Sequence, residues 1–294
     1  MKLNRLFVAL GASAAVLALA PAGQAVASSP DVAERAQAPS SEVSAYWTPE
    51  RIAEATADPM PMPTPDGSPA APEAGERALI QKVPGPYTSA KLRSLGRLLF
   101  TTGGRNSSCS ATSVEAGNKN LVWTAAHCLH YNGVAAQNVT FLPAFLNNEK
   151  PYGTWPAKKT FIPQKWISSN GQDFSVDYAA FTVDSQGGKT LTDTVGAKGV
   201  VFEDKKNQNT DMYGYPAESP YTGQEMYTCG GIAATVQTFD AKIACNGIGG
   251  QSGGAWLNAE DKVWAVNSRS DRRTVTYGTL FDSAAKQLYQ QAGA

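Results

Sequence analysis

The sequence predicts an all-β fold, a barrel or a sandwich, that ends in a single helix. The first observation is a series of short segments rich in β-forming residues, separated by clusters of Gly, Asn, Asp and Pro. The second is that no segment in the middle of the chain keeps the apolar periodicity of a helix. The third is a change of period at the C-terminus, where apolar residues recur at helical spacing: Phe281, Ala284, Ala285, Leu288 and Tyr289. We expect this terminal helix to pack on the β domain.

Residues 1–27 have the features of a secretory signal peptide. Lys2 and Arg5 form a basic start, and residues 6–20 are apolar and uncharged. This run of about 15 residues is too short to span a bilayer comfortably. Small residues favour cleavage after Ala27, with cleavage after Ala25 as the alternative. No later segment has the length of a transmembrane helix, so we expect a secreted, extracellular protein that does not bind membranes.

Residues 28–85 are expected to form a Pro/Ala-rich propeptide or linker. They hold ten of the 18 prolines and no cysteine, a composition that predicts a mostly disordered leader. Only residues 51–57 are expected to form a turn or two of helix. The leader carries a net charge of −5 and residues 86–294 one of +3. This difference favours a propeptide that covers the domain, and a passive spacer is the alternative.

Residues 86–294 are long enough for a sizeable core and form the predicted folded domain. Turn-forming clusters divide this domain into ten predicted strands. They are Leu98–Thr102, Cys109–Val114, Leu121–Thr124, Val139–Leu142, Tyr178–Val183, Gly199–Phe202, Ile232–Thr238, Gly254–Leu257, Lys262–Val266 and Thr274–Tyr277.

A serine in a glycine-rich run, Gly249–Gly254, is the first candidate for chemistry. Ser252 is a poor nucleophile by itself, because a hydroxyl must lose its proton to an imidazole within hydrogen-bond reach. The chain has two histidines, His127 and His130, both in one short segment that begins Thr124-Ala125-Ala126-His127-Cys128. The glycines allow the N–H groups of Gly250 and Ser252 to converge on an oxyanion. Without the histidine segment, the run would be an ordinary Gly/Ser loop.

The third group that such chemistry requires is a carboxylate that orients the imidazole. Asp177 stands at the entrance of a predicted buried strand, where it can be shielded and still meet a histidine. Asp173 is the competitor, but it adjoins the polar loop 168–172 and is expected to be solvated. We therefore favour Asp177, which gives the chain order His, Asp, Ser that chymotrypsin shows.

The three segments 124–128, 177–181 and 249–254 resemble the signatures of the chymotrypsin-fold (trypsin-like) serine peptidases. Tyr213-Gly214-Tyr215-Pro216 and Gly253-Gly254-Ala255-Trp256 are similar to segments of the secreted bacterial, glutamyl-endopeptidase-like branch. The resemblance covers about residues 90 to 285 and makes 86–294 a serine peptidase domain. It implies two antiparallel six-stranded β-barrels, near 90–190 and 195–280, with the terminal helix after them.

By this resemblance, His127 is the general base, Asp177 orients it, and Ser252 is the nucleophile of a triad in the cleft between the barrels. Gly250 and Ser252 form the oxyanion hole. The chain departs from the family at Gln251, where an aspartate usually pairs with the new N-terminal amine after activation. A neutral amide cannot form that ion pair, so the animal type of activation switch is not expected here.

The four cysteines allow three disulfide connectivities. The resemblance implies a bond between Cys128 and Cys109, which leaves Cys229 to pair with Cys245. A rival interpretation is a zinc site formed by the two histidines and Cys128, but it lacks further ligands. We expect no metal and no organic cofactor, and His130 is expected on the surface or in a loop.

Substrate selection is expected in a pocket that follows from the family alignment. Its base falls at Asn246 and its wall at the strand that holds Asn267, Ser268 and Arg269. Asn246 supplies no carboxylate for a buried Lys or Arg of the substrate, so basic residues are expected last, after acidic or medium apolar ones. Arg269 is expected to pair with an acidic substrate side chain, to narrow the pocket, or to be a solvated charge at its rim.

The sequence thus predicts a secreted serine endopeptidase that hydrolyses peptide bonds through an acyl-enzyme. The alternatives are an inert peptidase-fold binding protein and an esterase that uses the same site. Protein or peptide substrates are the expected partners, with the chain's own propeptide as a further one, and we expect a monomer. Nucleic acid is not expected, because the positive charge is small and its lysines are scattered.

Overall fold

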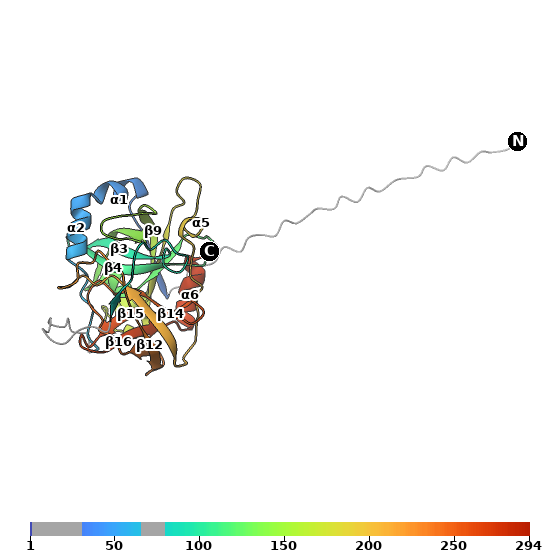
Figure 1. Ribbon diagram of the computed structural model, residues 1–294. Coiled ribbons are helices and arrows are strands. Elements are labelled where there is room, and N and C mark those ends of the chain that lie inside the picture. Colours follow the sequence, from blue (N-terminus) through green and yellow to red (C-terminus); the bar gives the residue numbers. More distant parts are fainter. Residues whose placement is uncertain (2–30, 66–79) are drawn as a thin grey trace.

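The computed structural model describes residue 1, residues 31–65 and residues 80–294, which form two closed barrels stacked on each other (Figure 1). The sheet order of the first barrel is β9-β10-β5-β4-β3-β8, and β8 pairs back to β9. Its strands are β3 (Leu95–Thr102), β4 (Arg105–Val114), β5 (Leu121–Thr124), β8 (Gln137–Pro143), β9 (Trp155–Pro163) and β10 (Ala179–Val183).

The second barrel has the order β11-β14-β15-β16-β13-β12, and β12 pairs back to β11. Its strands are β11 (Gln208–Gly214), β12 (Tyr227–Thr235), β13 (Asp240–Ile243), β14 (Ala255–Asn258), β15 (Val263–Ser270) and β16 (Thr276–Leu280). All pairings within both barrels are antiparallel. The predicted pair of six-stranded barrels is confirmed.

Short elements connect these strands and carry part of the site. They are α3 (Ala126–Leu129), β6 (His130–Tyr131), β7 (Val134–Ala135), α4 (Gln164–Ser168), the 3-10 turn η1 (Phe174–Val176) and α5 (Leu191–Val195). A two-residue strand, β2 (Gln81–Lys82), pairs with the outer edge of β12. None of the described helices has both the length and the apolar character that crossing a membrane requires.

The predicted terminal helix is α6 (Ser283–Ala292), and it packs on β9 and β10 of the first barrel. Asp282 caps its first turn by accepting a hydrogen bond of 2.9 Å from the backbone of Ala285. The apolar face buries Leu288, and the Phe281 ring just before the helix lies 5.2 Å from the Trp123 ring of β5. The helix therefore covers one side of the first barrel, although the strands that precede it in the chain belong to the second barrel.

The leader differs from its prediction. Residues 31–65 are ordered: β1 (Val32–Ala36) adds to β9, and α1 (Ser40–Tyr46) and α2 (Pro49–Ala57) lie along the outside of the first barrel (Figure 1). The expected disorder is wrong for this part, because its large apolar side chains are covered: Val43, Trp47, Ile52 and Met60 are buried and belong to the same hydrophobic cluster as the first barrel. The Pro- and Ala-rich composition of the leader as a whole gave no indication that these few apolar side chains would be buried. The rest of the leader, apart from residues 80–85, and the signal peptide after residue 1 lie outside the described residues.

Some predicted strands also need correction. Residues 199–202 form no strand, and only a single bridge joins Val200 to Val263. Three barrel strands were missed, namely β9, β11 and β13, as were the shorter or peripheral strands β1, β2, β6 and β7. β9 begins and ends beside prolines and contains two lysines, while β11 is polar at its start, so neither has the alternation that the sequence search required.

Candidate active site

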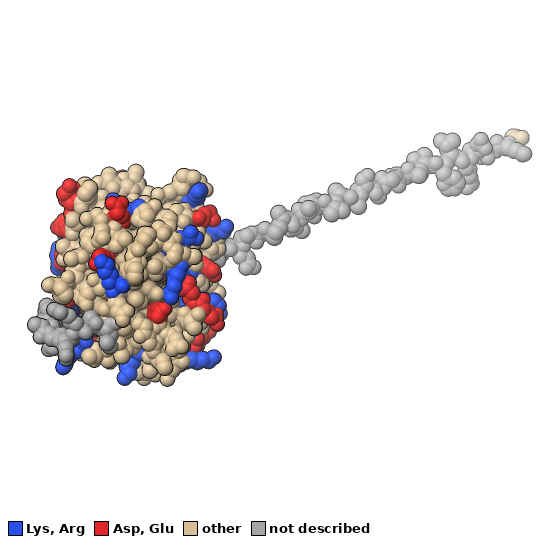
Figure 2. Space-filling model, in the orientation of Figure 1, with Lys and Arg blue, Asp and Glu red and all other residues tan. Residues whose placement is uncertain are grey.

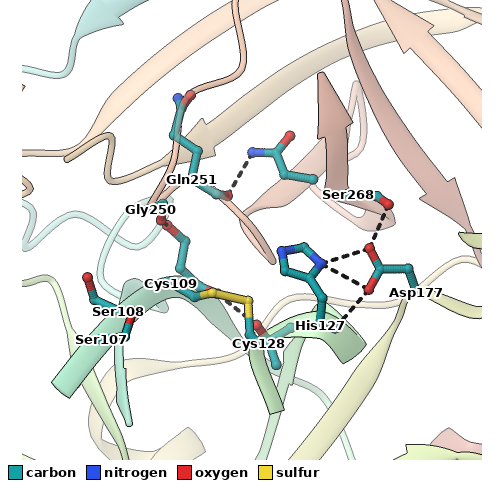
Figure 3. Close-up of a disulfide and its surroundings, with 12 residues drawn as sticks. Ser107, Ser108, Cys109, His127, Cys128, Asp177, Gly250, Gln251 and Ser268 are labelled. Carbon is teal, nitrogen blue, oxygen red and sulfur yellow. Dashed lines mark hydrogen bonds and ion pairs between the residues drawn. A yellow bond between two sulfur atoms is a disulfide. The ribbon is translucent and has the colours of Figure 1, made fainter. Parts of the chain in front are cut away.

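Asp177 and His127 form the centre of the site. The short helix α3 starts one residue after β5, and because Thr124 pairs with Ala179, His127 lies near the start of the buried strand β10. The Asp177 carboxylate accepts hydrogen bonds from the backbone N–H of His127 at 3.0 Å and from its ring Nδ1 at 2.9 Å. Ser268 on β15 donates its hydroxyl to the same carboxylate at 2.6 Å, as Figure 3 shows. The carboxylate is thus held from both barrels.

The charge on Asp177 is maintained in spite of its complete burial. Burial would raise the pKa of this carboxyl group, because a low-dielectric environment disfavours the ion. The electrostatic interaction with His127, the hydrogen bonds from its ring and backbone, and the Ser268 hydroxyl act in the opposite direction. Their sum leaves the pKa of Asp177 below its ordinary value, so this group is an anion at neutral pH.

The Ser252 loop depends on two glycines in the left-handed region, Gly250 at φ +91° and Gly253 at φ +74°. A Cβ on Gly250 would stand 2.5 Å from the Tyr215 carbonyl oxygen, so only glycine fits there. The loop is fixed to β4 through Ser110, whose N–H donates to the Ser252 carbonyl at 2.8 Å. The Ser110 hydroxyl also donates to the Gly250 carbonyl, at 2.9 Å.

The same stretch of β4 holds the histidine turn. Cys109, next to Ser110, forms a disulfide with Cys128, next to His127. Figure 3 shows this disulfide beside the imidazole. The loop of Ser252 and the turn of His127 are therefore tied to two consecutive residues. His127 Nε2 and Ser252 Oγ are both buried, and neither has a hydrogen-bond partner among the described residues.

The comparisons with known proteins agree with this geometry. No protein-family model and no curated protein matches the chain. Among solved structures, protease Anisep of Arthrobacter nicotinovorans is 35% identical, with 70% of this chain and 98% of that chain covered and a TM-score of 0.65. The chain belongs to the chymotrypsin-fold serine peptidases.

Two further structures extend this peptidase family's comparison. The thermostable serine protease AL20, from an extremophilic microorganism, is 34% identical, covers 70% of this chain and 99% of its own, and has a TM-score of 0.64. A Glu endopeptidase bound to MPD is 20% identical, covers 74% of this chain and 98% of its own, and has a TM-score of 0.61. At that identity, the last likeness concerns the fold alone. The predicted family is confirmed.

Both predicted disulfides of this serine peptidase are present, Cys109–Cys128 and Cys229–Cys245. The sulfur atoms of Cys109 and Cys128 lie within 4.8 Å of a His127 ring nitrogen, a spacing that would suit a metal. Because the two sulfurs are bonded to each other, neither is the thiolate that zinc requires. The rival zinc interpretation therefore loses its cysteine ligands.

The other acid and the other histidine lie apart from this centre. Asp173 caps η1 through Ser175 and forms an ion pair of 2.8 Å with Lys165, so it is turned away from His127. His130 is buried in β6 rather than exposed, which corrects the expectation of a surface or loop position. Burial lowers its pKa, and the nearby charge of Arg35 lowers it further.

The buried side chains of Gln251 and Asn267 stabilise the Ser252 loop of the peptidase through hydrogen bonds. The Gln251 side-chain oxygen accepts from the N–H of Ile248 at 2.9 Å, which closes the turn before Ser252. Asn267 donates to the Gln251 carbonyl at 3.0 Å and accepts from the Trp256 ring at 2.5 Å. The predicted wall residue Asn267 thus has its amide occupied by the nucleophile loop.

The predicted pocket carries no free charge among its described residues. Asn246 has a buried side-chain oxygen with no hydrogen-bond partner in the described part of the chain. Arg269 is 4% exposed, pairs with Asp240 at 2.5 Å and stacks 4.6 Å from the Phe174 ring. The solvated-rim alternative for Arg269 is wrong. Burial raises the pKa of Asp240 in spite of the neighbouring Arg269. Burying this ion pair therefore costs free energy, which the attraction between the two charges offsets only in part.

The sequence search missed two parts of the site. Ser110 was not identified, although its place directly after a cysteine of a predicted strand was the available signal. The leader residues 58–63 were also missed, and they run into the cleft next to His127, where Pro61 and Pro63 line a cavity of about 240 Å³. Two prolines in a leader predicted to be disordered gave no signal of a fixed path.

Proposed function

We propose that this serine peptidase is a secreted endopeptidase in which Ser252 attacks the peptide carbonyl and forms an acyl-enzyme. The observation that carries the proposal is the Asp177 carboxylate at 2.9 Å from His127 Nδ1. This contact keeps a proton on Nδ1 and leaves Nε2 as the base. Nε2 and Ser252 Oγ are both buried and form no hydrogen bond, to each other or to another described residue, so the proposed proton transfer requires the two atoms to come within hydrogen-bond reach.

The reaction then follows in two halves. His127 takes the proton of Ser252 as the bond to the carbonyl carbon forms, and the N–H groups of Gly250 and Ser252 stabilise the oxyanion. His127 returns the proton to the leaving amine as the peptide bond breaks. A water molecule, deprotonated by His127, hydrolyses the acyl-enzyme and restores Ser252. Asp177 stabilises the imidazolium in both halves.

Secretion is supported by the two disulfides, which form and persist in oxidising compartments. Each closes a loop of 19 or 16 positions, for which the entropic stabilisation is about 3 kcal/mol. The disulfide at Cys128 stabilises the His127 turn, and the one at Cys245 stabilises the segment before the pocket. Both therefore favour a site that keeps its geometry outside the cell.

A fluorophosphonate probe tests this proposal on the processed, secreted protein. We expect covalent labelling at Ser252, hydrolysis of internal peptide bonds, and a loss of about 10⁴-fold or more in Ser252→Ala and His127→Ala with unchanged circular dichroism. An inert binding protein would take up no label. An esterase would be labelled but would cleave esters and leave peptides intact.

A further inference from the structure

The leader crosses the cleft along a defined path. On the first barrel, the N–H of Met60 donates to the Ser108 carbonyl at 2.9 Å, and the Ser107 hydroxyl donates to the Asp58 carbonyl at 2.8 Å. Asp58 also forms an ion pair with Arg105 on the same strand, β4. This edge of β4 is two residues from Ser110, which holds the Ser252 loop.

At the catalytic centre the leader occupies backbone donors that the proposed reaction needs. The N–H of Gly250, half of the proposed oxyanion hole, donates to the Met60 carbonyl at 3.1 Å. Farther along, the N–H of Ser270 on β15 donates to the Pro63 carbonyl at 2.9 Å. The leader thus runs from Gly250 to Ser270 in the N-to-C direction.

Met62 fills the pocket between these two contacts. Its side chain is completely buried, and its Sδ stands 2.6 Å from the place that a Cβ on Gly247 would take. Thr276 Oγ1, at 2.7 Å, and Ser270 Cβ, at 2.8 Å, border the same point. Gly247 follows Asn246, the predicted base of the pocket. An unbranched apolar side chain therefore occupies the pocket that selects the substrate.

This arrangement cannot be a productive substrate complex. In a bound substrate, a single residue places its side chain in the pocket and presents its carbonyl to Ser252. The substrate residues that run along β15, past the pocket, are N-terminal to that residue. Here Met62 supplies the side chain and Met60 the carbonyl, while the chain beyond the pocket, at Pro63, is C-terminal. The Met60 side chain lies in the core of the first barrel instead. The leader runs through the cleft in the opposite direction to a substrate.

We propose that residues 58–63 are a built-in inhibitor that lies in the cleft in reverse and places Met62 in the specificity pocket. This inference rests on the proposed function, because it assigns the same cleft. Reversal explains how the leader can fill the site without presenting a cleavable bond. It also indicates the pocket's preference, an unbranched apolar side chain.

The first barrel holds the inhibitor at a high effective concentration. The buried Arg97 guanidinium donates to the Thr56 carbonyl at the end of α2, at 3.2 Å. Glu54 accepts from Asn106 at 2.7 Å, and the Trp47 ring donates to the Asn138 carbonyl at 2.7 Å. With α1 and α2 docked by these contacts, residues 58–63 remain next to the cleft even when they detach briefly.

The test measures the rate of fluorophosphonate labelling of Ser252 in the intact, leader-attached chain, followed as the full-length band on a gel. Met62→Asp places an unpaired charge in the pocket, and we expect labelling about tenfold or more faster than in the wild type. Met62→Gly should have the same direction. Met62→Leu is the matched control, and it should stay as slow as the wild type because the pocket remains filled.

Processed forms of the same variants separate this inference from the proposed function. After the leader is removed, Met62→Asp and wild type should cleave a peptide equally fast, which shows that the domain has folded. Equal labelling of intact wild type, intact Met62→Asp and intact Met62→Gly would overturn the inhibitor while the peptidase activity stands. If no processed form takes up label or cleaves a peptide, it is the proposed function that fails.

Discussion

At the scale of single residues, Asp177 is one of the groups that link the two barrels. Its carboxylate accepts two hydrogen bonds from His127 of the first barrel and one from Ser268 of the second. A buried carboxylate without such donors would protonate, and the imidazole would then lose its orientation. Asp177 therefore holds the structure together and also has a proposed catalytic role. Mutation of Asp177 and of its neighbour Asp173 should have different effects on activity.

Asp177→Asn should lower kcat by about 10⁴-fold, because an amide favours the wrong imidazole tautomer. Asp173→Asn should change kcat little, since its partners are Lys165 and Ser175. Peptide hydrolysis at saturating substrate measures both. A dead Asp173→Asn enzyme beside an active Asp177→Asn enzyme would show that the carboxylate assignment is wrong.

The pocket makes a second prediction at this scale. Arg269 is neutralised by Asp240 and Asn246 is uncharged, so we expect cleavage after unbranched apolar residues to exceed cleavage after Asp, Glu, Lys or Arg. Asn246→Asp should add a carboxylate at the base and raise cleavage after Lys and Arg by about tenfold or more. A peptide-library profile of both processed enzymes measures this. Dominant cleavage after Lys or Arg by the wild type would contradict the pocket assignment.

At the scale of elements, the strands that the sequence predicted best are those buried on both faces of the sheet. β5 was predicted with its observed bounds, because all four of its residues are buried between β4 and β10 and belong to β-forming types. β9 was missed because its two lysines interrupt the apolar pattern. The three signature segments of the site were recognisable because their residue types follow from the chemistry. The pocket's occupant was not, since only the folded chain brings Met62 beside Gly247.

His130 in the β6–β7 hairpin leads us to predict that the free energy of unfolding depends on pH. His130 in β6 is buried and near Arg35 of β1, so its pKa is lower in the folded state than the ordinary value of 6.5. The unfolded chain therefore binds a proton that the folded chain resists, and stability falls as the pH drops below about 6.5. His130→Gln should remove this part, at most about 1.4 kcal/mol per pH unit.

Urea unfolding of the full chain at pH 7, 6 and 5 measures this dependence for wild type and His130→Gln. We expect the wild type to lose more unfolding free energy over this range than the variant. The two proteins differ only at residue 130, so the difference between their profiles isolates the effect of His130. Identical pH profiles would exclude the assigned effect of burial.

At the scale of the whole molecule, the leader spans both barrels, with β1 on the first and Pro63 on the second. Charged side chains of both signs are interspersed on the face in Figure 2. The leader also forms ion pairs with the first barrel, from Asp58 to Arg105 and from Glu34 to Lys159. Removal of the leader then opens the site without any required change in the Ser252 loop, because Gln251 and Ile248 hold that loop internally.

Maturation is expected by cleavage between about residues 75 and 97, of which residues 75–79 lie outside the described residues. β3 begins at Leu95, and Ile80 and Val83 are already buried, so we place the cut before Ile80. Mature chains that begin one or two residues earlier should keep most of the activity, since Gln251 needs no terminal amine. N-terminal sequencing and peptide assays of such forms measure this. A complete loss of activity would reveal a buried terminus.

The position of α6 sets the time at which the first barrel is covered during synthesis. The first barrel is translated early, but its surface over β9 and β10 is covered by the final helix, and Asn118 donates to the Ala292 carbonyl at 2.8 Å. Domains made on the ribosome generally fold in order from the N-terminus. Here the first barrel keeps an uncovered apolar side until α6 has been made. A chain that stops before α6 therefore exposes that side.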